Sequence, residues 1–346
     1  VGPRRDVMRS ADGWKAESAV YAIFPPTGQS DMMGCLHSPM REPVMRRSYV
    51  TLDVFTDQLF GGNPLAVVLD AAGLSTEQMQ KIAIEFGYSE TTFVLPAVEA
   101  DHTAHVRIFT PGGELPFAGH PNIGTAFALA RQVEAQGREL PETLLFEEKA
   151  GLVPVRLERE NGRVVRAELM APEAMTRRSR MIPENAAACL GLEPEDICTD
   201  HHAPQVVSVG LPFLIVELAS RDALRRSYGE LAAHRRLLAS NGISSVYAYT
   251  RNAGESAFEK GSDIQGRMFS PLDGIAEDPA TGSATVAAVA FLSALENGAD
   301  LSLTFTQGVD MGRPSLLDAR TEAGKAYVAG SCVPVMDGFF TLESEV

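Results

Sequence analysis

Apolar and polar residues alternate with a period of two along much of this chain, which is the pattern of strands with one buried face. The alternation begins near Tyr49 and recurs between turn segments such as Gly61-Gly-Asn-Pro64. It predicts strands at residues 49–55, 65–69, 91–95, 152–157, 164–169, 206–209, 213–218, 246–249, 264–269, 301–306 and 326–332, with a last apolar segment at 338–342.

A helical period interrupts the strands at a few places. The clearest case is residues 75–87, where Ser75 suits the N-cap, Gln78 completes a capping box and Gly87 suits the end of the helix. Further helices are predicted at about 121–134, 183–190, 221–238 and 279–295. Many strands with one long helix in each half predict an α+β fold, a curved and mostly antiparallel sheet around a central helix, made twice.

One motif occurs twice in the chain. Arg-x-Phe-Thr/Ser-Pro stands at residues 107–111 and again at 267–271, a spacing of 160. Pro-x-x-Gly-Ser/Thr-Ala stands at 121–126 and again at 279–284, a spacing of 158. The repeat predicts two related halves, with a two-residue gap in one copy.

Each copy places a polar residue directly before a proline that we expect to open a helix. The residues are His120 before Pro121 and Asp278 before Pro279. If the halves face each other, two helix N-termini meet in one cleft, with free N–H groups and positive partial charge.

The first 47 residues differ from the rest, because they are rich in proline and show no sustained periodicity. We interpret residues 1–47 as an irregular N-terminal extension with Met45 as a candidate natural start. The alternative is an arm that packs on the body of the protein or on a partner subunit.

Two domains follow this extension in the predicted organisation. Residues 48–172 with 333–346 form the first domain, and residues 173–332 form the second. Pro172 and the basic segment 177–180 indicate a linker between them.

The composition restricts the possible partners. The chain of 346 residues carries 30 basic and 45 acidic side chains, a formal charge of −15, which argues against nucleic acid or an anionic membrane as partner. Small anions stay possible, because backbone amides bind them. No apolar run is long enough to span a membrane, and no signal-peptide pattern is present.

The four cysteines, Cys35, Cys189, Cys198 and Cys332, are scattered and form no C-x-x-C pair. They are typical of reduced thiols, so we expect a cytoplasmic protein.

Glu90 is the first candidate for chemistry. It stands between a helix that ends at Gly87 and an apolar strand, a position that would partly desolvate its carboxylate. Desolvation raises the pKa of a carboxyl group toward the range useful for general acid/base work. On local sequence alone, a solvated glutamate at a strand end is the more common explanation, because most glutamates are solvated.

His120 and Asp278 are further candidates. A helix N-terminus favours the neutral form of the His120 ring, which can then donate or accept a hydrogen bond. Asp278 could cap its own helix or hold a hydroxyl or amine of a substrate, and both roles are compatible. A capping or loop role alone also explains either residue.

The segment Thr281-Gly-Ser283 suits a bound carboxylate. Gly282 lets a ligand approach the backbone closely, and the amides and the Ser283 hydroxyl can donate to it. A phosphate loop is disfavoured, because no G-x-x-x-x-G-K-[ST] motif occurs. Asn63 is interpreted as a turn residue.

His201-His202 is the one pair that suggests a metal. We interpret the pair as lacking an acidic or cysteine partner in the spacing of a metal-binding motif, so we expect no metal site.

Several of these segments together resemble the PhzF family of phenazine-biosynthesis isomerases. The matching pieces span about residues 48 to 345 and are Asp53-Val-Phe55, Gly62-Asn-Pro64, Leu65-Ala-Val-Val68, Ser89-Glu-Thr91, Arg107-Ile-Phe-Thr-Pro111, Glu114-Leu-Pro-Phe-Ala-Gly-His-Pro121 and Glu277-Asp-Pro-Ala-Thr-Gly-Ser-Ala284. The last two runs are long and specific.

The resemblance implies a diaminopimelate-epimerase-like fold, with two pseudo-symmetric α+β domains, an active site between them and usually a homodimer. It implies neither metal nor organic cofactor. By motif, Glu90 corresponds to the family's acid/base glutamate. The other residues that match the site are catalytic His120, Asp278 and Ser283 and substrate-contacting Ser89, Gly119 and Gly282.

The resemblance leads to a hypothesis of cofactor-free isomerisation of a small carboxylic acid, in which Glu90 moves a proton between carbons. One alternative is an epimerase or racemase of an amino or hydroxy acid that uses Glu90 with His120 or Asp278. The two-cysteine racemase mechanism is disfavoured, because no cysteine falls in either motif. Another alternative is a non-catalytic binder of small molecules.

Overall fold

The computed structural model describes residues 44–239, 242–251 and 261–343. Its strands are β1 (Val44–Val54), β2 (Asn63–Val68), β3 (Glu90–Leu95), β4 (Ala104–Thr110), β5 (Gly113–Leu115), β6 (Thr143–Glu148), β7 (Gly151–Glu160), β8 (Arg163–Met170), β9 (Thr176–Arg180), β10 (Gln205–Ser208), β11 (Pro212–Glu217), β12 (Ser245–Thr250), β13 (Ile264–Ser270), β14 (Ile275–Asp278), β15 (Ser302–Gln307), β16 (Ser315–Glu322) and β17 (Lys325–Glu343). Its helices are α2 (Thr76–Phe86), α3 (Gly119–Ala135), α4 (Pro183–Leu190), α5 (Arg221–Arg226), α6 (Leu231–Leu237) and α7 (Gly282–Leu295), with single-turn helices at Pro194–Asp196, Pro271–Asp273 and Val309–Met311.

Both halves of the molecule use the same order of paired strands. The order is β1–β2–β3–β4–β6–β7–β8 in the first half and β10–β11–β12–β13–β15–β16–β17 in the second. In each half the second pair and the fourth pair are parallel and the others antiparallel. Parallel neighbours need a crossover, which α2 and α3 supply in the first half and α5, α6 and α7 supply in the second. The predicted α+β fold made twice is therefore confirmed.

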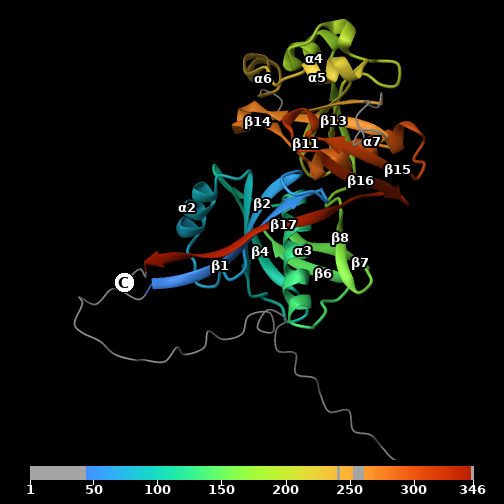
Figure 1. Cartoon of the computed structure of the whole chain (residues 1–346). Coiled ribbons are helices and arrows are strands. Elements are labelled where there is room, and N and C mark those ends of the chain that lie inside the picture. The colour runs from blue at the N-terminus through green and yellow to red at the C-terminus, as the bar shows by residue number, and fades with distance from the viewer. Residues whose placement is uncertain (1–43, 240–241, 252–260, 344–346) are drawn as a thin grey trace, which may run out of the picture.

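Each half is built around one long helix (Figure 1). In the first half α3 packs against β1, β2, β7 and β8, and in the second α7 packs against β10, β11, β16 and β17. Both helices are buried over most of their length, and their apolar residues belong to one continuous core. This arrangement fixes the direction of both helices, and their first turns lie at the joint between the halves.

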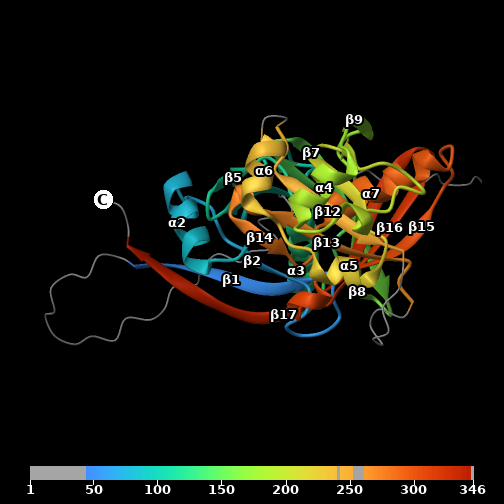
Figure 2. The ribbon, with the colours of Figure 1, turned by 90° about the horizontal axis from the view of Figure 1, so that it is seen from above.

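The last strand belongs to both halves. β17 pairs with β16 of the second half and with β8 and β1 of the first, and it runs across the molecule in Figure 1. Seen from above in Figure 2, it lies along β1 as a ribbon that ends beside α2. The two segments predicted at 326–332 and 338–342 are therefore one strand. The alternation breaks near Pro334, where the register against β1 shifts.

Three local predictions were wrong. β1 begins at Val44 and not near Tyr49. Its first residues pair only with β17, and their inner face is only partly buried and includes Arg47, so no apolar alternation marks the strand in the sequence. The basic segment 177–180 belongs to β9, which pairs with β10, and is not a linker. The helix predicted at 221–238 is two helices, α5 and α6.

The break between α5 and α6 has a clear cause in the second half. The Arg267 guanidinium caps the C-terminal end of α5 by donating to the carbonyl oxygens of Leu224, Arg225 and Ser227. A new N-cap then starts α6, because the Glu230 side chain accepts from the Ala233 N–H. The capping box predicted at Ser75 and Gln78 is confirmed at the start of α2.

The two motif copies align differently from the sequence prediction. Arg107 pairs with Glu114 through two hydrogen bonds, and Arg267 pairs with Glu277 in the same way. The two arginines are 160 residues apart, whereas the two glutamates are 163 residues apart. Three extra residues therefore lie in the second copy, instead of a two-residue gap. The helices also begin at equivalent glycines, Gly119 and Gly282.

This alignment matches His120 with Ser283 and not with Asp278. Asp278 is the last residue of β14, three residues before the N-cap Thr281, so its predicted role as a helix cap was wrong. Pro279 likewise precedes α7 and does not open it.

Residues 1–43, most of the predicted extension, lie outside the described residues. The predicted boundaries of two domains, 48–172 with 333–346 and 173–332, stay a prediction. Among the residues that the structure describes, no helix is both long and apolar enough to cross a membrane.

Candidate active site

The N-termini of the two central helices meet at the joint between the halves. A Cβ atom added to Gly119 would lie 3.3 Å from the backbone nitrogen of Ser283 and 3.6 Å from the carbonyl carbon of Gly282. The absence of a side chain at Gly119 therefore lets the two helix starts approach at backbone contact. Helix N-termini carry unpaired N–H groups and positive partial charge, so the joint is suited to a negatively charged group.

Glu90 reaches this joint from the first residue of β3. The preceding helix α2 ends at Gly87, whose left-handed conformation (φ 66°) turns the chain back toward the sheet. β3 then runs parallel to β2, with Glu90 beside Leu65. This strand–helix–strand connection fixes the Glu90 side chain inside the first half.

Glu90 and His120 form a close buried pair. Glu90 Oε2 lies 3.5 Å from His120 Nε2, and the side chains are only 14% and 6% exposed. Neither of these two atoms has a hydrogen-bond partner within the described part of the chain. A buried carboxyl oxygen and a buried ring nitrogen without partners leave capacity to bind an additional polar group.

Burial sets the protonation of this pair. It raises the pKa of Glu90 to about 7, and the adjacent Ser89 lowers that pKa by a smaller amount. It lowers the pKa of His120 to about 4, although the nearby Asp278 charge acts in the opposite direction. The expected neutral imidazole follows from burial as the largest cause. At pH 7 the pair thus combines a neutral ring with a carboxyl group near its midpoint.

Asp278 completes the charged set from the second half. Burial raises the pKa of Asp278 to about 6, and the negative charge of Glu90 raises that pKa further. The hydroxyl of Thr281 donates to one carboxylate oxygen, and Asn63 Nδ2 donates to the other at 2.8 Å. Because two coupled carboxyl groups lie in one buried site, ionising one disfavours ionising the other.

Asn63 is the residue that the sequence prediction missed. Its buried amide lies in β2 and donates to Asp278 Oδ1 and, at 2.9 Å, to the Ala280 carbonyl. Its Oδ1 accepts from the Ser89 hydroxyl at 3.1 Å, and its Nδ2 lies 3.4 Å from His120 Nδ1. One side chain therefore links the candidate residues of both halves. The sequence shows only a Gly-Asn-Pro turn signal, which does not reveal these distant partners.

The turn that carries Asn63 is clamped by the second half. Arg313 donates to the carbonyl oxygens of Gly61 and Gly62 at 2.7 and 2.9 Å and pairs with Asp53. Gly62 has φ 58°, and an added Cβ would lie 2.3 Å from the Val54 carbonyl oxygen, so only glycine fits. The clamp fixes the position of Asn63 relative to the second half.

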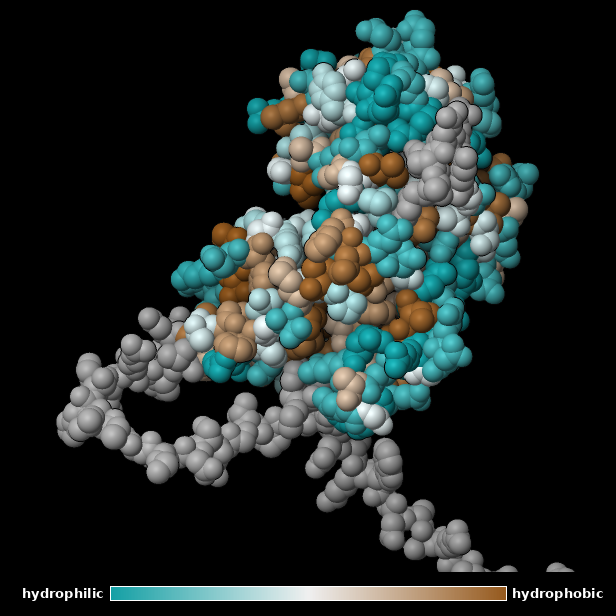
Figure 3. All heavy atoms as spheres, viewed as in Figure 1, coloured by the Kyte–Doolittle hydropathy of each residue, from teal (hydrophilic) through white to brown (hydrophobic). Residues whose placement is uncertain are grey.

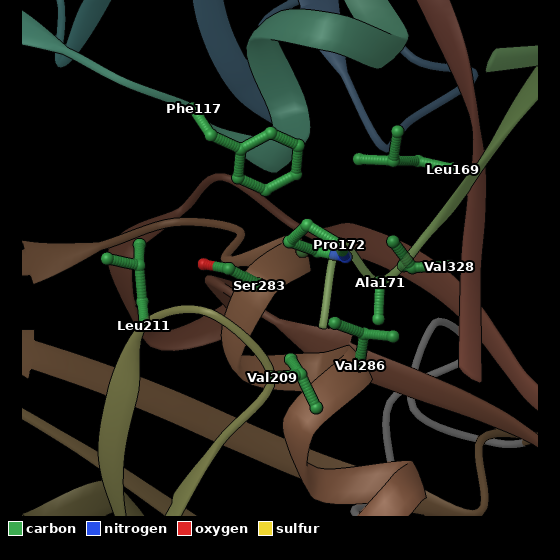
Figure 4. Close-up of a pocket in the computed structure, with 10 residues that line it drawn as sticks. Phe117, Leu169, Ala171, Pro172, Val209, Leu211, Ser283, Val286 and Val328 are labelled. Carbon is green, nitrogen blue, oxygen red and sulfur yellow. The ribbon is translucent and has the colours of Figure 1, made fainter. Parts of the chain in front are cut away.

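A narrow apolar cavity adjoins Ser283. Its volume is about 10 Å³, near the space that one water molecule needs. Phe117, Leu211, Val286 and Val328 are among the residues that line it, and in Figure 4 the Ser283 side chain projects into the space between Phe117 and Leu211. An apolar part of a ligand can pack on this wall while its polar part meets the helix N-termini.

All seven predicted site residues lie at this joint. Asn63 contacts Ser89, His120 and Asp278, and Glu90 lies against His120. Gly119, Gly282 and Ser283 form the adjoining helix starts. Their catalytic and binding roles stay a prediction. Among the described residues, the group of potential metal ligands that comes together lies outside this cleft.

Comparisons with known proteins agree on the family and the fold. The model of the family "phenazine biosynthesis-like protein" matches residues 52–338. The trans-2,3-dihydro-3-hydroxyanthranilate isomerase of Pseudomonas chlororaphis is 38% identical over 278 residues, which cover 79% of this chain and 90% of that protein.

Solved structures show the same fold. A phenazine biosynthesis protein of the PhzF family from Bacillus anthracis superposes with a TM-score of 0.75 at 26% identity, over 86% of this chain and 99% of that chain. A hydroxyproline epimerase from Agrobacterium vitis gives a TM-score of 0.54 at 13% identity, over 86% of this chain and 93% of that chain. The predicted epimerase-like fold is confirmed.

We predict that Asn63→Ala destabilises the protein more than Asn122→Ala. Both asparagines are fully buried, but the partners given for Asn122, the Ala118 carbonyl and the Glu148 carboxyl group, both lie in the first half, whereas those of Asn63 lie in both halves. Losing the Asn63 amide leaves several buried partners unpaired, so the free energy of unfolding should fall by at least about 1 kcal/mol more. Urea unfolding of both variants measures the difference, and equal losses would contradict a linking role for Asn63.

We predict that the stability gain of Glu90→Gln over wild type grows with pH. The pKa of Glu90 is about 7 in the folded protein, above its ordinary value of 4.5, so the folded state binds this proton more tightly than the unfolded state. Wild-type stability is therefore lost between these two pH values, whereas glutamine cannot ionise. The difference in free energy of unfolding should rise from about pH 5 to pH 7.5 and then level off.

Glu85→Gln on α2 is the matched control, because Glu85 is exposed to solvent. Urea titrations across the pH range should give a flat difference for this variant. A flat difference for Glu90→Gln as well would show that Glu90 is not desolvated in the folded protein.

Proposed function

This chain belongs to the phenazine biosynthesis-like protein family and is an isomerase, and on that premise we propose that it moves a proton between carbons of a small carboxylate-bearing substrate without a cofactor. The observation that carries the proposal is Glu90, a buried carboxyl group whose pKa is raised to about 7 beside a neutral imidazole. A general acid/base works best when its pKa lies near the working pH, because both protonation states are then available.

Glu90 carries the proton in the proposed reaction. As carboxylate it removes a proton from a carbon of the substrate, and as carboxylic acid it returns that proton to another carbon of the same conjugated system. Its unpartnered Oε2 is available for this transfer. The reaction needs no redox partner, because the proton and the electron pair stay within the substrate and Glu90.

The helix starts hold the negative charge that this transfer creates. Gly119, Gly282 and Ser283 contribute backbone N–H groups and one hydroxyl at the joint, and these groups suit the substrate carboxylate. Fixed donors aimed at a developing negative charge lower the barrier, because they need no reorganisation during the reaction. A Cβ at Gly119 would meet the backbone of Ser283 and one at Gly282 would meet the Phe55 ring, so both glycines are needed for the two helix starts to lie together.

His120 and Asp278 orient the polar groups of the substrate. The neutral His120 ring offers Nε2, which has no partner among the described residues, for a hydrogen bond. The Thr281 hydroxyl and the Asn63 amide both donate to the Asp278 carboxylate, and these hydrogen bonds favour its ionised form. A substrate amine or hydroxyl group would donate to Asp278, beside the Ser89 hydroxyl.

The distance between Glu90 and His120 bears on the epimerase alternative. A two-base epimerase holds its carbon between the bases, and 3.5 Å leaves no room for a carbon there. Glu90 with Asp278 remains the pair that this alternative needs. A non-catalytic binder needs no carboxyl group with a pKa near neutrality, so it leaves the Glu90 environment unexplained.

We also propose that the protein is cytoplasmic and forms a homodimer. An apolar groove of about 410 Å³ beside β1 and β17 supports association, and half-exposed Met336 contributes to its lining. In the view of Figure 3 apolar residues gather on the first half, whereas the second half is mainly hydrophilic.

We predict that the purified protein moves protons on a small carboxylate and that Glu90→Gln abolishes this activity. The assay is NMR in D2O with a panel of dienoic, hydroxy and amino carboxylates that includes trans-2,3-dihydro-3-hydroxyanthranilate, the substrate in the name of the Pseudomonas relative. Removing an acid/base group costs about 100- to 10,000-fold in rate, whereas binding should persist.

The matched control for this assay is Glu85→Gln, which should keep wild-type activity. Double-bond migration with deuterium uptake at carbon, lost only in Glu90→Gln, would support the proposal. Near-normal turnover in Glu90→Gln would reject Glu90 as the acid/base. Inversion at a single stereocentre without double-bond migration would favour the epimerase.

A further inference from the structure

A second cluster of reactive side chains lies in the second half. Donor atoms of Cys198, His201 and Glu217 all lie within 4.8 Å of one another. From the sequence we expect no metal at His201-His202, but Cys198 stands only three residues before His201 and is one possible partner. The fold adds the second partner, Glu217 at the end of β11. The Cys198 N–H donates to the Glu217 carbonyl oxygen at 2.9 Å, which fixes the loop against the strand.

The geometry of the trio is close to that of a metal site. His201 Nδ1 lies 2.9 Å from Glu217 Oε1. Zinc bonds of about 2.0–2.3 Å place tetrahedral ligands about 3.3–3.8 Å apart, so the His201–Glu217 pair has to open by about 0.5 Å and a separation near the 4.8 Å limit has to close by about 1 Å. The side chain of His201 is 51% exposed and can rotate to provide this movement.

The Glu217 carboxylate is already held in one orientation. It is 3% exposed, and it accepts from the Tyr249 hydroxyl and from Arg251 Nε, both at 3.0 Å. His202 Nε2 lies 2.8 Å from the same hydroxyl. Ligating carboxylates in metal sites are usually supported by such hydrogen bonds, which orient the ligand and limit the entropy lost on binding.

We propose that Cys198, His201 and Glu217 bind one zinc ion, with the fourth position open to water. Thiolate, imidazole and carboxylate are the zinc ligands of proteins. Arg251 offsets one of the two negative charges, so the soft thiolate and imidazole donors carry most of the affinity. This combination favours Zn²⁺ over Mg²⁺ or Ca²⁺, which need several oxygen ligands.

The site is separate from the catalytic joint and stabilises the second half. His202 packs edge-to-face on Phe291, which lies nine residues after Gly282 in α7 and so about 13 Å along the helix. The ion would tie the loop that contains Cys198 and His201 to the end of β11. A ligand that binds only the folded state raises its stability by mass action.

Cobalt substitution tests the proposal in the full, tag-free, reduced protein. One equivalent of Co²⁺ should give a thiolate-to-cobalt charge-transfer band in the near ultraviolet, which Zn²⁺ displaces. Cys198→Ser should lose the band, and His201→Gln should weaken Zn²⁺ binding by more than about tenfold. Zn²⁺ should raise the thermal midpoint of wild type and leave that of Cys198→Ser unchanged.

Cys35→Ser is the matched control, because it removes a thiol that is not part of the trio, and it should keep the band. The proposal is overturned if one equivalent of Co²⁺ gives no band, if the band survives in Cys198→Ser, or if it disappears in Cys35→Ser. His201→Gln changes a half-exposed side chain, so its binding constant decides the case even if Cys198→Ser fails to fold. These readouts do not depend on the isomerase reaction.

Discussion

The site depends on one buried amide that joins the two halves. Asn63 donates to Asp278 and Ala280 of the second half and accepts from Ser89 of the first. Arg313 holds the turn before Asn63 from the other side. Since these groups are buried, water cannot replace a lost partner, and the relative position of the halves is set by hydrogen bonds as well as by apolar packing.

Burial at this joint also orders the protonation of the site. Burial raises the pKa values of Glu90 and Asp278 and lowers that of His120, because the charged form of each group is less stable away from water. The hydrogen bonds from Asn63 and Thr281 favour charge on Asp278, whereas Glu90 Oε2 has no such donor among the described residues. Near neutral pH, Glu90 is therefore the carboxyl group that we expect to gain and lose the proton.

Local sequence predicted the parts of this fold that depend on local physics. The capping box of α2 and the alternating strands need only neighbouring residues, and the repeated Arg-x-Phe motif revealed two related halves. The sequence could not show that Asn63 is more than a turn residue, because its partners Asp278 and Ala280 lie more than 200 residues away. The three extra residues before α7 were also missed, because a proline after a polar residue, as at Pro279, is typical of a helix start.

The same limit applies outside the cleft. Two adjacent histidines gave no metal prediction, although Cys198 stands three residues before His201, because the acidic partner Glu217 reaches His201 only through the end of β11. β9 looked like a linker, because an exposed edge strand with basic side chains has no apolar alternation. In each case tertiary pairing supplied a partner that no local pattern encodes.

The central claim is that the folded protein holds Glu90 as a carboxyl group that titrates near neutrality. NMR of protein labelled with carbon-13 at the glutamate carboxyl, with the Glu90 signal assigned through its absence in Glu90→Gln, follows this titration directly. The account predicts a midpoint near pH 7 for that signal. A midpoint near 4.5, the ordinary value for a solvated glutamate, would contradict it.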